Sequence, residues 1–195
     1  ADYFSTSTGV PVGMTILDGR LVTSDGGWNA IGFLKDGKAI IGHPELSITL
    51  TTEAGETYPI HALNNVRTAD GLYLYTPDFD YCTRTSAEGT EVLLDVSGSL
   101  KPGRKLKATV LPVANTKNTE MQEGQMVLSL TANNKLGLDL AAILTEGDEI
   151  ILKKYSPIGE MQSFAKDYTE SLFRSLGHIA CIVDRDQVVA ASGVS

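Results

Sequence analysis

Residues 46–63 have the sequence LSITLTTEAGETYPIHAL and indicate the fold. In residues 46–52 apolar side chains alternate with hydroxyl side chains, which is the pattern of a β-strand with one buried face. The dipeptide Gly55-Glu56 then favours a turn, and residues 58–63 form a second apolar segment. We therefore predict two neighbouring strands joined by a tight turn.

The same pattern continues on both sides of this pair. Short apolar segments are separated by Gly, Asp and Pro, which are typical of turns. The dipeptides Asp18-Gly19 and Asp36-Gly37 and the tripeptide Asp25-Gly26-Gly27 are typical of hairpins. The further predicted strands are residues 14–17, 30–34, 38–41, 72–75, 91–96, 106–113, 126–129 and 149–155.

Helical periodicity occurs mainly in residues 160–177, where Phe164, Tyr168, Leu172 and Leu176 recur at helical spacing. Residues 139–144 predict one or two helical turns, and residues 179–191 predict a last hairpin. The strands come in runs, so we predict an α+β fold, with a mainly antiparallel or mixed β-sheet and a few helices. The apolar face of the long helix fits packing within the chain or against a partner chain.

Composition narrows the possible functions. The 195 residues fit a single domain over residues 1–195, and the formal net charge is −8. The densest basic stretch contains Lys101, Arg104, Lys105 and Lys107, and we interpret it as solvated surface. We therefore expect no nucleic-acid partner and, since no apolar run is long enough, no membrane span.

Cysteine and histidine do not indicate a metal site. Cys82 and Cys181 lack the spacing of metal ligands, and the three histidines are scattered along the chain. Two cysteines do not make a disulfide framework, and whether they pair stays open. We expect no cofactor.

Polar residues that could carry chemistry gather between residues 63 and 85. An arginine near a strand end, here Arg67, can bind a phosphate with two parallel hydrogen bonds. Asn and Thr side chains can bind sugar hydroxyls or phosphate oxygens. From the residues alone an ordinary alternative remains open, in which Asn64 and Asn65 shape a turn and Arg67 lies on the surface.

The order of these residues resembles the phosphodiester glycosidase family. That family includes the enzyme that removes N-acetylglucosamine from phosphodiester caps, and bacterial proteins related to exopolysaccharide. The similarity covers most of residues 1–155. The motifs that carry it are Asn64 three residues before Arg67, Tyr75-Thr76-Pro77, Thr83-x-Thr85, Gly89-x-Glu91-Val92, and shorter matches at residues 1–4, 13–19, 124–129 and 144–151.

The resemblance implies a secreted hydrolase that cleaves the glycosidic bond of a sugar-1-phosphodiester on cell-surface or exopolysaccharide glycans. Its location would be extracellular, periplasmic or on the cell surface. A non-catalytic module that binds glycan or phosphate is the alternative. The family's later segments would follow residue 195, so the domain is expected to be incomplete at its C-terminus.

The resemblance also implies roles for particular residues. Arg67 would contact the phosphate, and Asn64 would orient the sugar or the phosphate. The reaction also needs a carboxylate to activate water or act as the nucleophile. Asp2 is our first candidate, although it stands where the family usually has a small residue, and Asp80 and Asp78 are second choices. The residues expected to complete the substrate site are Thr83, Thr85, Thr76 and Tyr75.

Overall fold

The structure is a computed structural model that describes residues 4–6, 9–24, 29–43, 47–155, 157–184 and 187–193. For residues 113–115, 155, 157–164, 183–184 and 187–189 we describe the backbone only. The chain divides into two compact units, Ala1–Lys154 and Tyr155–Ser195, which we treat separately. The single domain over residues 1–195, and its incompleteness at the C-terminus, stay predictions.

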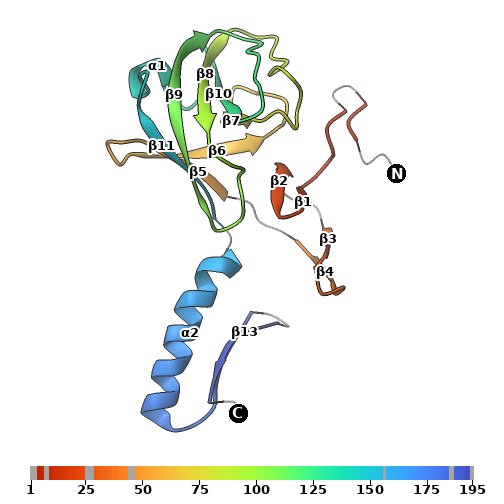
Figure 1. Ribbon diagram of the computed structural model, residues 1–195, viewed down its shortest axis with the longest axis vertical. Helices are drawn as coiled ribbons and strands as arrows, with labels where there is room; N and C mark the ends of the chain where they lie inside the picture. Colours follow the sequence, from red (N-terminus) through yellow and green to blue (C-terminus); the bar gives the residue numbers. More distant parts are fainter. Residues whose placement is uncertain are drawn as a thin grey trace. The chain divides into compact units, whose positions relative to one another are not determined.

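The first unit is built around a closed barrel of seven strands (Figure 1). Around the barrel the strand order is β10-β7-β6-β5-β11-β9-β8. The strands are β5 (Ser47–Thr51), β6 (Thr57–Leu63), β7 (Leu72–Tyr75), β8 (Gly89–Val96), β9 (Lys105–Asn115), β10 (Gln125–Thr131) and β11 (Glu149–Tyr155), with a short helix α1 (Leu140–Ile143) before β11. The predicted fold class is confirmed as a β-rich fold with few helices, but a closed barrel was not predicted.

The first two barrel strands in the sequence are the pair predicted from residues 46–63. Strand β5 pairs antiparallel with β6, and Ile48 faces Ile60 across the ladder. Ile48 and Leu50 are buried while the residues between them are partly exposed, which matches the alternating sequence. At Gly55 the backbone has φ of 84°, a conformation that glycine adopts without the steric cost of a side chain.

Strand β7 closes one side of the barrel by pairing with two strands. It is parallel to β6 and antiparallel to β10, so the barrel sheet is mixed. All four of its residues are buried, because Leu72 and Leu74 enter the barrel core while Tyr73 and Tyr75 pack in a second cluster. That cluster also contains Met121 and Val127. Both faces of β7 are therefore covered by packed side chains.

Two hairpins of the first unit lie outside the barrel sheet. One joins β1 (Thr15–Leu17) to β2 (Arg20–Thr23), and the other joins β3 (Ala30–Phe33) to β4 (Ala39–Gly42). Their turns are the predicted Asp18-Gly19 and Asp36-Gly37, but β2 itself was not predicted.

The second unit contains helix α2 (Pro157–Leu176) and the hairpin of β12 (Ala180–Asp184) and β13 (Gln187–Ser192) (Figure 1). The predicted long helix and last hairpin are confirmed. Ala165 and Thr169 are fully buried on the helix, and the Thr169 hydroxyl lies 3.0 Å from the Ser192 hydroxyl. Of the helices in the described residues, none is long and apolar enough to cross a membrane.

The packing of the barrel core generates a prediction about stability. Leu94 is fully buried in the core, so Leu94→Ala should lower the free energy of unfolding by about 2–5 kcal/mol. Urea denaturation followed by the near-ultraviolet circular dichroism of the tyrosines measures this loss. Leu136→Ala, at a leucine that is 42% exposed, is the control and should cost far less. Equal losses in both variants would contradict the described core.

Candidate functional site

The polar centre of the barrel unit is the carboxylate of Glu91 on β8. This residue is fully buried on the strand face opposite to Val92 and Leu94, which enter the core. The donors to its two oxygens come from four segments far apart in sequence. They are the hydroxyls of Thr83 at 2.9 Å, Thr85 at 2.8 Å and Ser129 at 2.8 Å, the backbone N–H of Thr119 at 2.9 Å, and Nη1 of Arg67 at 3.4 Å.

Arg67 is the positive partner of this carboxylate, and its side chain is only 2% exposed. Its Nη1 also donates to the Ser129 hydroxyl at 2.8 Å, and its Nη2 donates to the carbonyl of Ala87. A Cβ at Gly89 would lie 2.7 Å from Nη1 of Arg67 and 2.1 Å from the carbonyl oxygen of Leu130. Glycine is therefore required at position 89, because a side chain there would displace the guanidinium.

The environment of Glu91 favours its charged form. Burial by itself would raise the pKa of the carboxyl, but hydrogen bonds from Thr119, Ser129 and Thr85 outweigh it and lower the pKa below the ordinary value. A buried charge is tolerated in a protein when it is paired and its hydrogen bonds are made. The Glu91 cluster, which we define as Arg67, Thr83, Thr85, Glu91, Thr119 and Ser129, meets both conditions.

Asn64 and Thr76 form a separate buried pair. The amide nitrogen of Asn64 donates to the carbonyl of Val22 at 2.6 Å and to the Thr76 hydroxyl at 2.8 Å, while its amide oxygen accepts from the Thr76 N–H at 2.8 Å. Asn64 also has φ of 53°, in the left-handed region that asparagine enters more readily than most residues. These bonds tie β2 to the end of β7 and use both donor positions of the amide.

A small pocket of about 80 Å³ lies beside Arg67. Tyr75 and Phe79 contact each other edge to face in its wall, with ring centroids 5.0 Å apart. The Tyr75 hydroxyl donates to the carbonyl of Asn65 at 2.7 Å, and burial raises the pKa of that hydroxyl. The lining residues are Val66, Arg67, Tyr75, Phe79, Thr83, Arg84, Thr85, Ser86 and Ala87.

The structure thus brings some of the predicted site residues together. Arg67, Tyr75, Thr83 and Thr85 line one pocket, whereas Asn64 and Thr76 bond to each other. Asp2 lies outside the described residues. The site roles predicted for all seven residues stay predictions.

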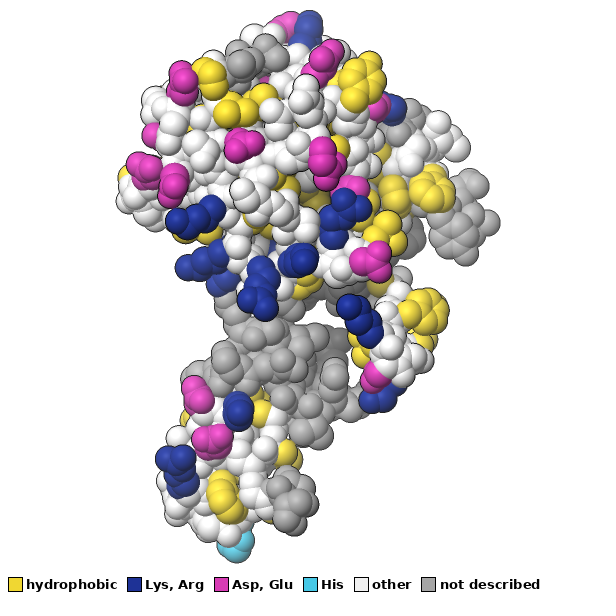
Figure 2. All heavy atoms as spheres, viewed as in Figure 1, with side chains coloured by type: hydrophobic (Ala, Val, Ile, Leu, Met, Phe, Trp, Pro, Cys, Tyr) yellow, Lys and Arg dark blue, Asp and Glu magenta, His cyan; other side chains and the backbone are white. Residues whose placement is uncertain are grey.

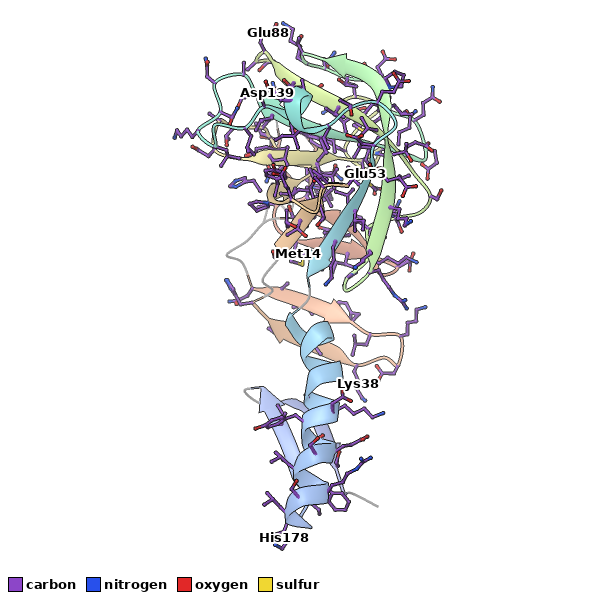
Figure 3. All side chains as sticks on the ribbon, turned by 90° about the vertical axis from the view of Figure 1, so that its left-hand side faces the viewer. Met14, Lys38, Glu53, Glu88, Asp139 and His178 are labelled. Atoms are coloured by element: carbon purple, nitrogen blue, oxygen red, sulfur yellow. The ribbon has the colours of Figure 1, made fainter. Side chains whose placement is uncertain are left out.

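Neither of the second-choice carboxylates belongs to the Glu91 cluster. Asp78 pairs with Arg20 at 3.0 Å, and Asp80 pairs with Arg84. Glu88, close to the pocket in sequence, is exposed at the edge of the barrel and pairs with Lys117 at 2.5 Å (Figure 3). Cys82 is buried and Cys181 is exposed, and both are free thiols.

Glu91 itself was missed as a polar centre. It appeared in the sequence only as part of the Gly89-x-Glu91-Val92 motif. The available signal was a carboxylate at the first position of the predicted strand of residues 91–96, with hydroxyl-rich segments before and after that strand.

The comparison with protein families locates a relationship in the second unit. Residues 160–195 match the family described as "Stage V sporulation protein T C-terminal, transcription factor". The chain is 49% identical over 59 residues to Stage V sporulation protein T of Bacillus subtilis (strain 168). That alignment covers 30% of this chain, and the chain spans about a third (33%) of the length of this relative.

Two solved structures resemble the fold at low sequence identity. A hypothetical protein from Synechocystis has a TM-score of 0.58 at 17% identity, over 84% of this chain and 29% of that one. A protein from Burkholderia pseudomallei K96243, described as a candidate exported protein, has a TM-score of 0.52 at 18% identity, over 74% of this chain and 33% of that one. These likenesses concern the fold alone.

The comparisons contradict the predicted identity. The assignment to the phosphodiester glycosidase family is wrong, since residues 160–195 match a family described as a transcription factor and the chain is similar to a sporulation protein. The same findings contradict four further predictions. These are the hydrolase acting on sugar-1-phosphodiesters, the alternative glycan-binding module, the sugar-phosphate partner and the location outside the cytoplasm. The expectation of no nucleic-acid partner is contradicted by the same two findings.

The Glu91 cluster generates a prediction about pH. Because the pKa of Glu91 is lowered on folding, its charge stabilises the fold above the unfolded pKa of about 4.5. This stabilisation is lost as the pH falls through the folded-state pKa. Glu91→Gln leaves Arg67 buried without its charge partner and should cost about 3–5 kcal/mol at pH 7. Urea midpoints at pH 7 and below pH 4 test this expectation.

Glu88→Gln is the matched control, since Glu88 is exposed and three residues from Glu91. The control should keep the urea midpoint of the unaltered protein at pH 7. A Glu91→Gln midpoint equal to that of the control would show that the cluster does not stabilise the barrel.

Proposed function

We propose that this chain acts in the regulation of transcription, and that residues 160–195 are the segment through which it does so. The observation that carries the proposal is the match of these residues to a family described as a transcription factor. The 49% identity to Stage V sporulation protein T over 59 residues supports the same function.

The boundaries of the match support the proposal physically. Residues 160–195 fall inside the second compact unit, Tyr155–Ser195, and span most of α2 and the whole β12–β13 hairpin. Sequence similarity that coincides with a structural unit is what a transferable module would produce. The match therefore covers a piece of structure with its own packing.

The packing of this unit depends on small residues at the contact between helix and hairpin. Ala165 is fully buried, and the Thr169 hydroxyl bonds to the Lys166 carbonyl at 3.0 Å as well as lying against Ser192. A Cβ at Gly193 would lie 2.5 Å from the ring of Phe173, and Gly193 has φ of 85°. These positions allow the hairpin to approach α2 closely, so we expect them to be needed for regulation.

The barrel supports this function rather than catalysis. In the Glu91 cluster the carboxylate and guanidinium bind to groups of the protein itself. A carboxylate and a guanidinium that are engaged in this way suit a structural role, because their hydrogen bonds are already made within the protein.

A segment exchange in Bacillus subtilis tests the proposal. The part of Stage V sporulation protein T that matches residues 160–195 would be replaced by this chain's residues, and a reporter that depends on the Bacillus protein would be measured. We expect reporter activity within about threefold of the unaltered protein, because the packing of the segment is retained. Activity as low as in a strain without the protein would contradict the proposal.

Two further exchanges separate function from folding. Ala165→Asp places a charge at a fully buried position and should abolish the reporter response. Lys166→Asp places the same side chain at the next, exposed position and should retain most of it. Equal responses from the two variants would count against the described packing of α2.

A further inference from the structure

The β3–β4 hairpin has one face that carries only apolar side chains. Across the two strands Ile31 lies opposite Ile41, and Phe33 lies opposite Ala39. Successive side chains of a strand point to opposite faces, so these two cross-strand pairs share one face. We define the apolar face as Ile31, Phe33, Ala39 and Ile41. Its three large side chains are 61%, 83% and 77% exposed for Ile31, Phe33 and Ile41.

The opposite face of the hairpin is built differently. Of the strand residues on that face only Ile40 is large, and the others are alanine and glycine. A Cβ at Gly32 would lie 3.0 Å from Cγ1 of Ile40, so the Ile40 side chain lies over this glycine across the ladder. The large side chains are therefore concentrated on the apolar face. Figure 2 shows hydrophobic side chains at the surface of this hairpin.

In the part of the chain that the structure describes, β3 and β4 pair only with each other. They form a separate two-stranded sheet. The hydrogen bonds and the ion pair of residues 30–42 among the described residues also lie within the hairpin. A two-stranded hairpin is marginally stable at best in water, so apolar cover on one face would stabilise it.

The size of the apolar face suits a weak, specific interface. From the exposed fractions, its side chains present about 450 Å² to solvent. An exposed apolar patch of several hundred Å² is typical of a surface that binds another protein. Two such faces packed together would bury about 900 Å², close to the about 1,000 Å² expected of a biological interface.

We propose that the apolar face packs against the same face of a second copy of this chain. A two-fold interface uses one patch on both copies, so the patch must fit itself. A face without polar side chains meets this condition, because no charge or hydrogen-bonding side chain is buried without a partner. The inference goes beyond the proposed function in transcription and rests on different residues.

The charges of the chain favour contact at this face. The net charge is −8, so two copies repel each other, and their approach is least opposed where no carboxylate is buried. The charged residues of the hairpin are Lys35, Asp36 and Lys38, which lie at its turn (Figure 3). They would form a polar rim beside an apolar centre, which is the usual arrangement of an interface.

Sedimentation velocity of the full chain tests the proposal. Between about 1 and 100 µM we expect the mean mass to rise from that of one chain towards that of two. Phe33→Asp would bury a carboxylate against its own copy, so the dimer Kd should rise at least about a hundredfold. Because Phe33 is mostly exposed in the single chain, the circular dichroism spectrum should stay unchanged.

Leu17→Asp is the matched control, since Leu17 is 54% exposed on β1 of the other hairpin. The control should leave the dimer Kd within about twofold, because the same charge is then added away from the interface. Equal weakening by both changes would overturn the proposal, since added charge and not the apolar face would then control association.

A distance measurement tests which surface forms the contact. A nitroxide label at Lys38→Cys, in a chain with Cys181→Ser, would report the distance between two hairpin turns, because Cys82 is buried. Sheets packed face to face lie about 10 Å apart and these strands are short, so the labels should lie within about 40 Å of each other. A dimer without such a label pair would overturn the proposal.

Two more outcomes decide against the proposal. A chain that stays monomeric over the whole concentration range would overturn it. So would a monomer whose urea midpoint falls with Phe33→Asp, because the face would then be covered by the same chain. The segment exchange in Bacillus contains no residue of the hairpin, so its result bears on the regulatory segment alone.

Discussion

The barrel depends on one buried carboxylate, that of Glu91. An ionised group inside a protein is costly unless an opposite charge and hydrogen-bond donors surround it. Here those donors come from the loop before β8, the loop after β9, the strand β10 and the segment after β6. Satisfying one side chain therefore fixes the positions of several segments that the hydrophobic core does not order. Tyr73 and Tyr75 complete this outer layer by packing with Met121 and Val127.

Much of the fold could be predicted from sequence because burial and periodicity are local signals. Residues 46–52 alternate with period two, and the strand β5 they form buries Ile48 and Leu50. Closure of the barrel could not be predicted, because the pattern tells which face is buried and not which strand is the neighbour. The pairing of β5 with β11 joins segments about a hundred residues apart, and no local signal encodes it.

The candidate site shows a different limit of sequence reasoning. The structure brings Arg67, Thr83 and Thr85 close together, and the group that organises them is a carboxylate of the same chain. The amide of Asn64 similarly bonds to Thr76 and to the backbone. A polar residue that could bind a ligand and one that satisfies a buried partner look alike in sequence. The glycosidase interpretation rested on such short motifs and was wrong, whereas the regulatory proposal rests on residues 160–195 as a continuous match.

The ionised state of Glu91 can be measured directly by following its side-chain carboxyl carbon by NMR during a pH titration of the labelled protein. We predict that this signal titrates below pH 4.5, because the hydrogen bonds to the carboxylate lower its pKa. A Glu91 signal that titrates above pH 4.5 would contradict the account, since the carboxyl would then be protonated more readily in the folded barrel than in water.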